Sequence, residues 1–110
     1  MHTRMDIQGK LGHGGTIFPL DEIKKIREVA DRYGLLMHLD GARIWNVHTA
    51  TGIPLAELTA PFDSVCCCLS KGLGAPAGSM IMGSAEFIED CLLSRKLFGV
   101  AMRQVGILAA

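Results

Sequence analysis

The sequence predicts an α/β fold in which a mostly parallel sheet is flanked by helices. Short apolar runs of strand length alternate with amphipathic stretches of helical period, and glycine or proline separates them. Strands that alternate with helices in this way form βαβ units, whose strands are parallel. The chain has 110 residues, of which 49% are hydrophobic. This length allows one domain with a sizeable core.

The first predicted helix begins near residue 19 and ends before Gly34. Asp21 is expected to be its N-cap, because acidic residues crowd the first turn. Gly34 is expected to stop the helix as a C′ glycine. The basic run 24–27 is interpreted as a solvated face. Apolar residues recur at helical spacing along this stretch, at Ile23, Ile26, Val29 and Ala30.

Two further apolar runs predict buried strands. Residues 35–39 form the first, and residues 64–69 form the second. Between them, residues 42–51 predict a helix that Gly52 and Pro54 break, and residues 54–58 predict a short helical turn. The pattern is therefore strand, helix, helical turn, strand, as a parallel connection requires.

The rest of the chain predicts a loop, a short strand and helices. The glycine-rich residues 72–78 form the loop, and residues 79–82 form the strand. Ser84 is expected to cap a helix over residues 85–93. Another amphipathic stretch runs from residue 95 to the end.

Charge, hydropathy and cysteine usage exclude several classes of protein. The formal net charge is zero, so nothing favours nucleic acid or an anionic membrane as a partner. No signal-peptide core and no membrane-spanning run is found, which predicts a soluble, cytoplasmic protein. Cysteines 66–68 and Cys91 offer neither a disulfide framework nor zinc-ligand spacing, so no metal is expected. On a strand, Cys66 and Cys68 share one face and Cys67 takes the other.

Asp40 and Lys71 follow the two predicted buried strands. Ligands of open α/β sheets bind at the carboxyl ends of strands, so the two side chains could share a crevice. An ordinary ion pair is one interpretation. The other is a cofactor site: a lysine among glycines is open to a planar ligand and can act as a Schiff-base nucleophile, and a carboxylate can keep a pyridoxal ring nitrogen protonated.

Two longer segments favour the second interpretation. Residues 38–46 read His-Leu-Asp-Gly-Ala-Arg-Ile-Trp-Asn, and residues 68–79 read Cys-Leu-Ser-Lys-Gly-Leu-Gly-Ala-Pro-Ala-Gly-Ser. Both resemble, in the right order, segments of the threonine aldolases, in the aromatic amino acid beta-eliminating lyase/threonine aldolase family. The resemblance covers residues 14–110 and implies part of the large, pyridoxal-phosphate-binding domain of a fold-type I enzyme. Residues 1–13 show no convincing strand pattern and form a divergent N-terminal segment.

The resemblance implies roles for four residues. Lys71 would hold pyridoxal 5′-phosphate as the Schiff-base lysine, and Asp40 would bond its ring nitrogen. Arg43 would reach the phenolic oxygen or the substrate carboxylate, and Arg103 would support the site as a second cation. The implied reaction is cleavage of a β-hydroxy-α-amino acid, L-threonine or L-allo-threonine, to glycine and acetaldehyde, as in threonine catabolism and glycine biosynthesis. The resemblance also implies a homo-oligomer.

Four residues within the resemblance also have a purely structural interpretation. Without the longer match, Arg43 is more often an ion-pair or surface arginine, and Arg103 stays evenly balanced between a structural and a supporting role. Trp45 is interpreted as packing, and His38 as a satisfied interior residue on the same strand face as Asp40.

The chain also departs from the family pattern. Lys10 falls where the family has a candidate catalytic histidine, and Val100 and Ala101 replace two glycines before Met102. The family's phosphate loop and small C-terminal domain have no counterpart here. These departures predict a fragment, a truncated gene product or a degenerate copy with little aldolase activity. Another fold-type I lyase that catalyses β-elimination, or a non-catalytic assembly module, remain the alternatives.

Overall fold

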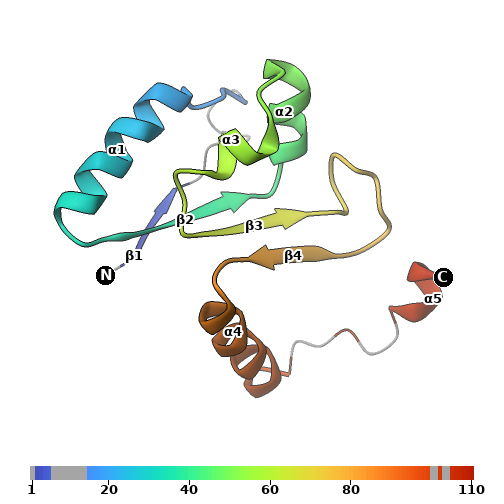
Figure 1. The fold of residues 1–110 in the computed structure, drawn as a ribbon. Coiled ribbons are helices and arrows are strands. Elements are labelled where there is room, and N and C mark those ends of the chain that lie inside the picture. Colours follow the sequence, from blue (N-terminus) through green and yellow to red (C-terminus); the bar gives the residue numbers. More distant parts are fainter. Residues whose placement is uncertain (1, 6–14, 100–101, 103–104) are drawn as a thin grey trace.

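The computed structural model describes residues 2–5, 15–99, 102 and 105–110. Its four-stranded sheet has the order β1-β2-β3-β4, as Figure 1 shows. The strands are β1 (His2–Met5), β2 (Leu36–Gly41), β3 (Ser64–Cys68) and β4 (Ser79–Met82). The first three run parallel, and β4 is antiparallel to β3. The mostly parallel sheet expected from the sequence is thus confirmed.

Strand β1 corrects one expectation. The sequence pattern predicts no strand before residue 19, yet His2–Met5 pair in parallel with residues 36–39 of β2. Four residues of mixed polarity carry no periodic signal by themselves. Pairing with a strand that is already ordered makes them a strand, and that is a tertiary effect.

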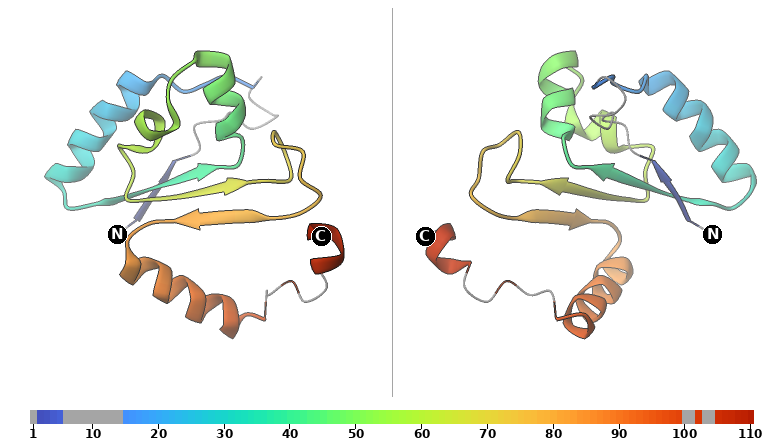
Figure 2. Two further views of the ribbon diagram at one scale, coloured as in Figure 1. Left: turned by 45° about the vertical axis from the view of Figure 1, so that its right-hand side comes forward. Right: turned by 180° about the vertical axis from the view of Figure 1, so that it is seen from behind.

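Three helices cover one side of the sheet (Figures 1 and 2). They are α1 (Leu20–Arg32), α2 (Ile44–Thr51) and α3 (Leu55–Thr59), while α4 (Ala85–Leu97) follows β4, and α5 (Gly106–Ala109) ends the chain. Several predicted boundaries were wrong, among them the ends of β2, predicted over residues 35–39, and the end of α4, predicted at residue 93. Helix α2 begins at residue 44 and not 42, because β2 extends through Gly41. The predicted last stretch is divided, since residues 95–97 belong to α4.

The two ends of α1 are capped by the backbone. Pro19 is the N-cap residue and no side chain caps this end, so the expected N-cap role of Asp21 was wrong. The carbonyl of Pro19 accepts hydrogen bonds from Glu22 N and Ile23 N, and Asp21 lies inside the first turn. At the other end Gly34 has φ +62°, and Leu35 N donates to Ala30 O at 2.8 Å. This confirms the predicted C′ glycine.

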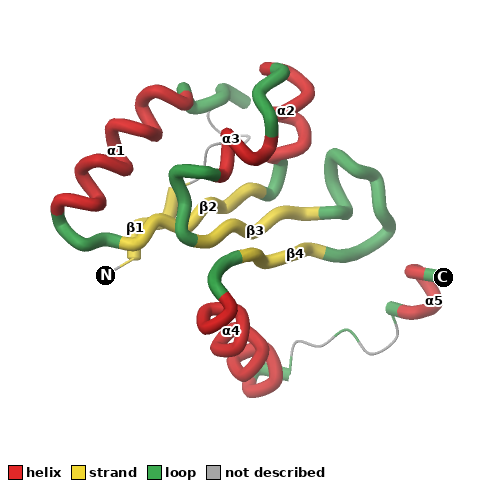
Figure 3. Tube along the Cα trace, in the orientation of Figure 1, coloured by secondary structure: helices red, strands yellow, loops and turns green. Residues whose placement is uncertain are grey.

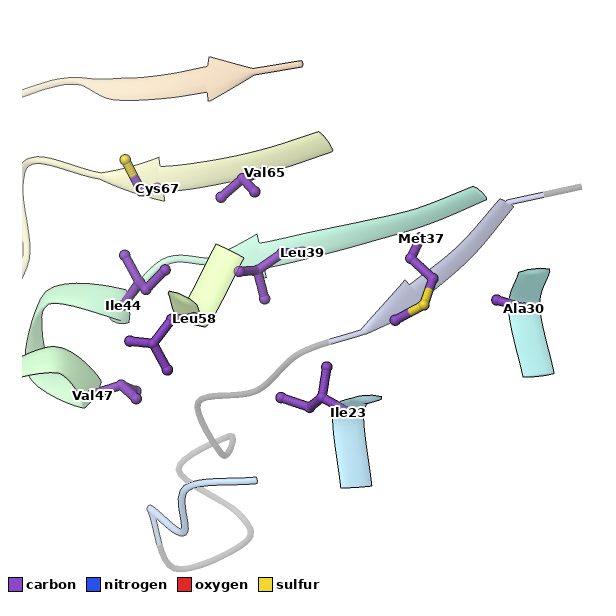
Figure 4. Close-up of a cluster of buried hydrophobic side chains, with 9 residues drawn as sticks. All are labelled: Ile23, Ala30, Met37, Leu39, Ile44, Val47, Leu58, Val65 and Cys67. Atoms are coloured by element: carbon purple, nitrogen blue, oxygen red, sulfur yellow. The ribbon is translucent and has the colours of Figure 1, made fainter. Parts of the chain in front are cut away.

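The core lies between the sheet and helices α1 to α3, as the close-up in Figure 4 shows. Alternate residues of β2 and β3 point into it, which follows from the two-residue period of a strand. Cys67 is buried in this core and Cys66 and Cys68 are not, so Cys67 lies on the opposite face from the other two, as the sequence predicts. The buried apolar side chains are Ile23, Ala30, Met37, Leu39, Ile44, Val47, Leu58, Val65 and Cys67.

Candidate cofactor site at the carboxyl edge of the sheet

The parallel pair β2 and β3 brings the two predicted site segments to one edge of the sheet. Asp40 is the penultimate residue of β2 and is the register partner of Cys66 on β3. Lys71 lies in the turn that follows β3, three residues after Cys68. Because neighbouring parallel strands end at the same edge, Asp40 and the Lys71 turn both lie at the carboxyl edge, where open α/β sheets bind ligands.

The loop that presents Lys71 is held in shape by its own backbone. It joins β3 to β4, as the tube in Figure 3 shows. Leu69 N donates to Gly78 O at 3.0 Å, Ala75 N donates to Leu69 O at 3.1 Å, and Gly74 N donates to Lys71 O at 2.9 Å. Gly74 and Gly78 have φ of +71° and +111°, conformations that suit glycine. Lys71 is therefore an exposed residue on an ordered loop.

Two contacts join the Lys71 loop to the segment that carries Asp40. The indole Nε1 of Trp45 donates a hydrogen bond to the backbone oxygen of Cys68 at 3.1 Å. A Cβ added at Gly72 would lie 2.5 Å from Oδ1 of Asn46, so the loop backbone sits directly on that side chain. Trp45 does pack against the core, but the packing interpretation missed its hydrogen bond. That bond depends on tertiary proximity and leaves no sequence signal.

The environment of Asp40 includes a cysteine that sequence reasoning treated as a small apolar residue. Sγ of Cys66 lies 3.7 Å from Oδ1 of Asp40 and donates to it. Burial is the main cause that raises the pKa of the Cys66 thiol, and the charge of Asp40 raises it further. The thiol therefore keeps its proton at neutral pH.

His38 lies on the same face of β2 as Asp40, two residues before it. Its Nδ1 lies 2.8 Å from Oγ of Ser64 on β3, so the ring is hydrogen-bonded and half-buried. This agrees with the interpretation of His38 as a satisfied interior residue. The face of the sheet that carries Asp40 therefore lies opposite the apolar core and holds hydrogen-bonded polar groups next to this carboxylate.

Of the two arginines expected at the site, the structure describes Arg43. Arg43 is half-buried and is the N-cap residue of α2, immediately after β2, and its carbonyl accepts from Asn46 N at 3.0 Å. Its backbone thus starts α2 at the edge where Asp40 lies. Arg103 lies outside the described residues.

Two other features are absent from the described residues. No cluster of three or more His, Cys, Asp or Glu side chains there has the arrangement of a metal site. No helix in the same part of the chain is long and apolar enough to cross a membrane.

The fold is that of part of the large domain of fold-type I pyridoxal-phosphate enzymes. The chain belongs to the beta-eliminating lyase family, whose sequence model matches residues 11–110.

Relatives and solved structures agree with this assignment. Low-specificity L-threonine aldolase 1 of Arabidopsis thaliana is 47% identical over 97 residues, which are 88% of this chain and 27% of that protein. The low-specificity L-threonine aldolase of Escherichia coli K12 is 44% identical over 98 residues, which are 89% and 29%. A solved structure from Listeria monocytogenes, provisionally assigned as an L-allo-threonine aldolase, matches with a TM-score of 0.81 at 29% identity, over 87% of this chain and 26% of that one. The chain thus spans little more than a quarter of the length of these proteins.

Proposed function

We propose that residues 14–110 are part of the cofactor-binding domain of a pyridoxal-phosphate-dependent lyase that cleaves L-threonine or L-allo-threonine to glycine and acetaldehyde. The observation that carries the proposal is the junction of the two site segments, where Trp45 Nε1 bonds Cys68 O. This bond links the strand end bearing Asp40 to the turn bearing Lys71. The relatives named as low-specificity L-threonine aldolases support the choice of substrate.

The residues present fit a planar pyridine cofactor. Lys71 is exposed, and the loop after it consists mostly of glycine, alanine and proline, so little bulk stands beside its amine. Glycine at 72 lets the loop backbone lie against Asn46. Asp40 supplies a carboxylate at the same edge of the sheet, as a protonated ring nitrogen requires.

When bound, the cofactor supplies an electron sink for the bond that breaks in the substrate. Lys71 would hold the cofactor through its amine, whose neutral form is the nucleophile. Asp40 accepts a charge-assisted hydrogen bond and holds a proton on the ring nitrogen. Arg43 provides a planar cation for the carboxylate of the amino acid or for a phenolic oxygen. Arg103 is proposed as a supporting cation on the resemblance alone.

Reductive trapping tests the attachment site. The chain is incubated with pyridoxal phosphate, reduced with borohydride, digested and mapped by mass spectrometry. We expect the adduct on Lys71 to exceed that on the other lysines, and Lys71→Ala to abolish it. Lys24→Ala is the matched control, because Lys24 is an exposed lysine on α1, away from the carboxyl edge. Adducts spread evenly over all lysines of a folded sample would contradict the proposal and favour a non-catalytic module.

Product analysis tests the reaction in a protein that contains this domain. Glycine and acetaldehyde from threonine support the aldolase, whereas 2-oxobutyrate and ammonia from threonine, or pyruvate and ammonia from serine, identify β-elimination. Homo-oligomeric assembly is a further part of the proposal that rests on the resemblance, and a cytoplasmic location is one that rests on the sequence pattern.

A further inference from the structure

The face of the sheet opposite the core carries a cysteine directly beside Asp40. Asp40 and Cys66 are register partners on parallel strands, so their side chains leave the sheet on the same face. Sγ of Cys66 is 3.7 Å from Oδ1 of Asp40, within the range of a thiol hydrogen bond. A carboxylate has no proton to give, so the thiol is the donor.

We propose that Cys66 is a positioning residue for the Asp40 carboxylate. Its thiol holds Oδ1 from the neighbouring strand, and this fixes the plane in which the carboxylate faces a cofactor. A hydrogen bond to a carboxylate also favours its ionised form, the form that a protonated ring nitrogen needs. This role deepens the proposed function and rests on it, since it concerns the same carboxylate.

The surroundings of Cys66 keep its thiol a donor. Burial raises the pKa of the thiol most, a hydrogen bond from the Gly41 backbone opposes this, and the negative charge of Asp40 raises it again. The net direction is upward, so the sulfur carries its proton at neutral pH.

Other ionisable residues of the described chain are placed near this face, and the register of β1 pairs Arg4 with His38. His38 is bonded to Ser64 two register positions away, and Cys68 lies two residues further along β3 on the same side. Arg43 follows β2 directly. On β4 the residues paired with Cys66 and Cys68 are Ile81 and Ser79, and neither has an ionisable side chain.

A set of variants at Cys66 separates hydrogen bonding from packing. Cys66→Ala removes the donor, and Cys66→Ser keeps one in the same place. We expect the pKa of the Asp40 carboxyl, followed by carbon-13 NMR titration, to rise by about 0.5 in the alanine variant and to return close to its original value in the serine variant. Cys68→Ala is the matched control, since it removes a thiol from the same strand and face, and it should leave this titration unchanged.

Two outcomes would overturn the positioning role. Equal shifts in the alanine and serine variants would mean that sulfur packing matters and its proton does not. An unchanged titration in all variants would mean that the contact has no energetic weight. The titration requires no bound cofactor, so it tests the positioning role even if no adduct forms on Lys71.

The same contact can be tested through the reactivity of the thiol, in a variant that leaves Cys66 in place. This test holds even if the substitutions at Cys66 prevent folding. In Asp40→Asn the negative charge is gone, so the pKa of the Cys66 thiol should fall. Site-resolved alkylation at a fixed mildly alkaline pH should then become about threefold faster at Cys66, with the rate at Cys91 unchanged. Equal rates at Cys66 in both proteins would count against the proposal.

Cofactor affinity connects the contact with function. We expect Cys66→Ala to weaken pyridoxal phosphate binding by about threefold to tenfold, and Cys66→Ser to restore it to within about twofold. If Lys71 forms no adduct in any protein, the proposed function fails while the titration result stands. If the adduct forms and the affinity is the same in all three proteins, the positioning role fails.

Discussion

Gly41 lies where the backbone of β2 passes close to the backbone of β3. A Cβ at this position would lie 2.6 Å from the backbone oxygen of Cys66, closer than real Cβ contacts come. The neighbouring atom belongs to backbone, so no side chain can move aside to relieve the contact. Glycine at 41 therefore allows the strand that carries Asp40 to lie beside the strand that precedes Lys71.

We predict that Gly41→Ala destabilises the chain by about 1–3 kcal/mol, the usual cost of overpacking a tight site. The free energy of unfolding from urea titration followed by circular dichroism measures it. Gly106→Ala is the control, because nothing lies within 4 Å of its built Cβ. A Gly41→Ala variant as stable as the control would show that the strands can separate without cost.

At the scale of elements, the amino-terminal edge of the sheet is tied together by Arg27 and Asp63. Arg27 Nη1 donates to Asp63 Oδ2 at 2.7 Å, and the same carboxylate oxygen accepts from Met37 N at 2.7 Å. Arg27 also bonds Asp31 and the carbonyl of Leu35. Its side chain is only 21% exposed, so the interpretation of the basic run as a solvated face was wrong for this member. Helix α1, the start of β2 and the start of β3 are thereby joined.

Asp63→Asn tests this junction through pH. Burial alone raises the pKa of the Asp63 carboxyl, but the hydrogen bonds from Met37 N and Arg27 outweigh it, and the pKa lies below its ordinary value. The carboxylate therefore stabilises the fold above its unfolded-state pKa, and this contribution disappears as the pH falls through the folded-state pKa. We predict that Asp63→Asn loses about 1–2 kcal/mol at neutral pH and loses less on acidification than the unmodified chain.

Urea titrations at a series of pH values, from neutral into the range where aspartate protonates, measure this effect. Asp90→Asn is the control, since Asp90 is exposed on α4. Parallel pH curves for the Asp63 variant and the unmodified chain would exclude a role for the carboxylate.

Helix α2 and the Lys71 loop form the second junction between elements, at the opposite edge. We predict that Trp45→Phe keeps the ring, loses the bond to Cys68 O, and destabilises the chain by about 1 kcal/mol. Hydrogen exchange should speed up at Leu69 N and Ala75 N, whose bonds shape the loop. Thr59→Val also removes a side-chain bond, to Leu55 O on α3, and should leave loop exchange unchanged. Unaltered loop exchange in Trp45→Phe would contradict the tethering role.

At the scale of the whole molecule, the hydrophobic core is one-sided. The core cluster lies between the sheet and α1 to α3, whereas α4 has no buried residue and all four residues of β4 are exposed. The radius of gyration is 15.2 Å, against about 13 Å for a compact domain of this length. Many large apolar side chains are exposed, among them Met80, Ile81, Met82, Leu92, Leu93, Leu97 and Phe98.

Leucine-to-alanine variants in the core and on α4 measure this difference through the free energy of unfolding. Leu39→Ala, at 0% exposure, should cost about 3 kcal/mol. Leu93→Ala, at 68% exposure, should change the free energy of unfolding by less than about 0.5 kcal/mol. We also expect the chain to bind an apolar dye and to self-associate through its uncovered apolar surface. Similar losses in both variants, in a monomer that binds no dye, would mean that α4 is packed in solution.

The sequence predicted the order and type of most elements because their signals are local. Gly34 ends α1, Ser84 accepts from Phe87 N at the start of α4, and β4 has the predicted bounds. Boundaries next to the site were less accurate, because β2 gains its last residues by pairing with β3. The cap of α1 was misassigned, because a carbonyl of extended backbone can serve where a side chain is expected.

The sequence by itself determined the family and the residue types of the candidate site. The segments around Asp40 and Lys71 are continuous in the chain, so their residue types can be read without coordinates. The tertiary structure alone decided that Trp45 holds the Lys71 loop, that Cys66 donates to Asp40, and that Arg27 joins three elements. Each of these contacts joins residues more than twenty positions apart, and which of them meet depends on strand register, which a local pattern does not specify.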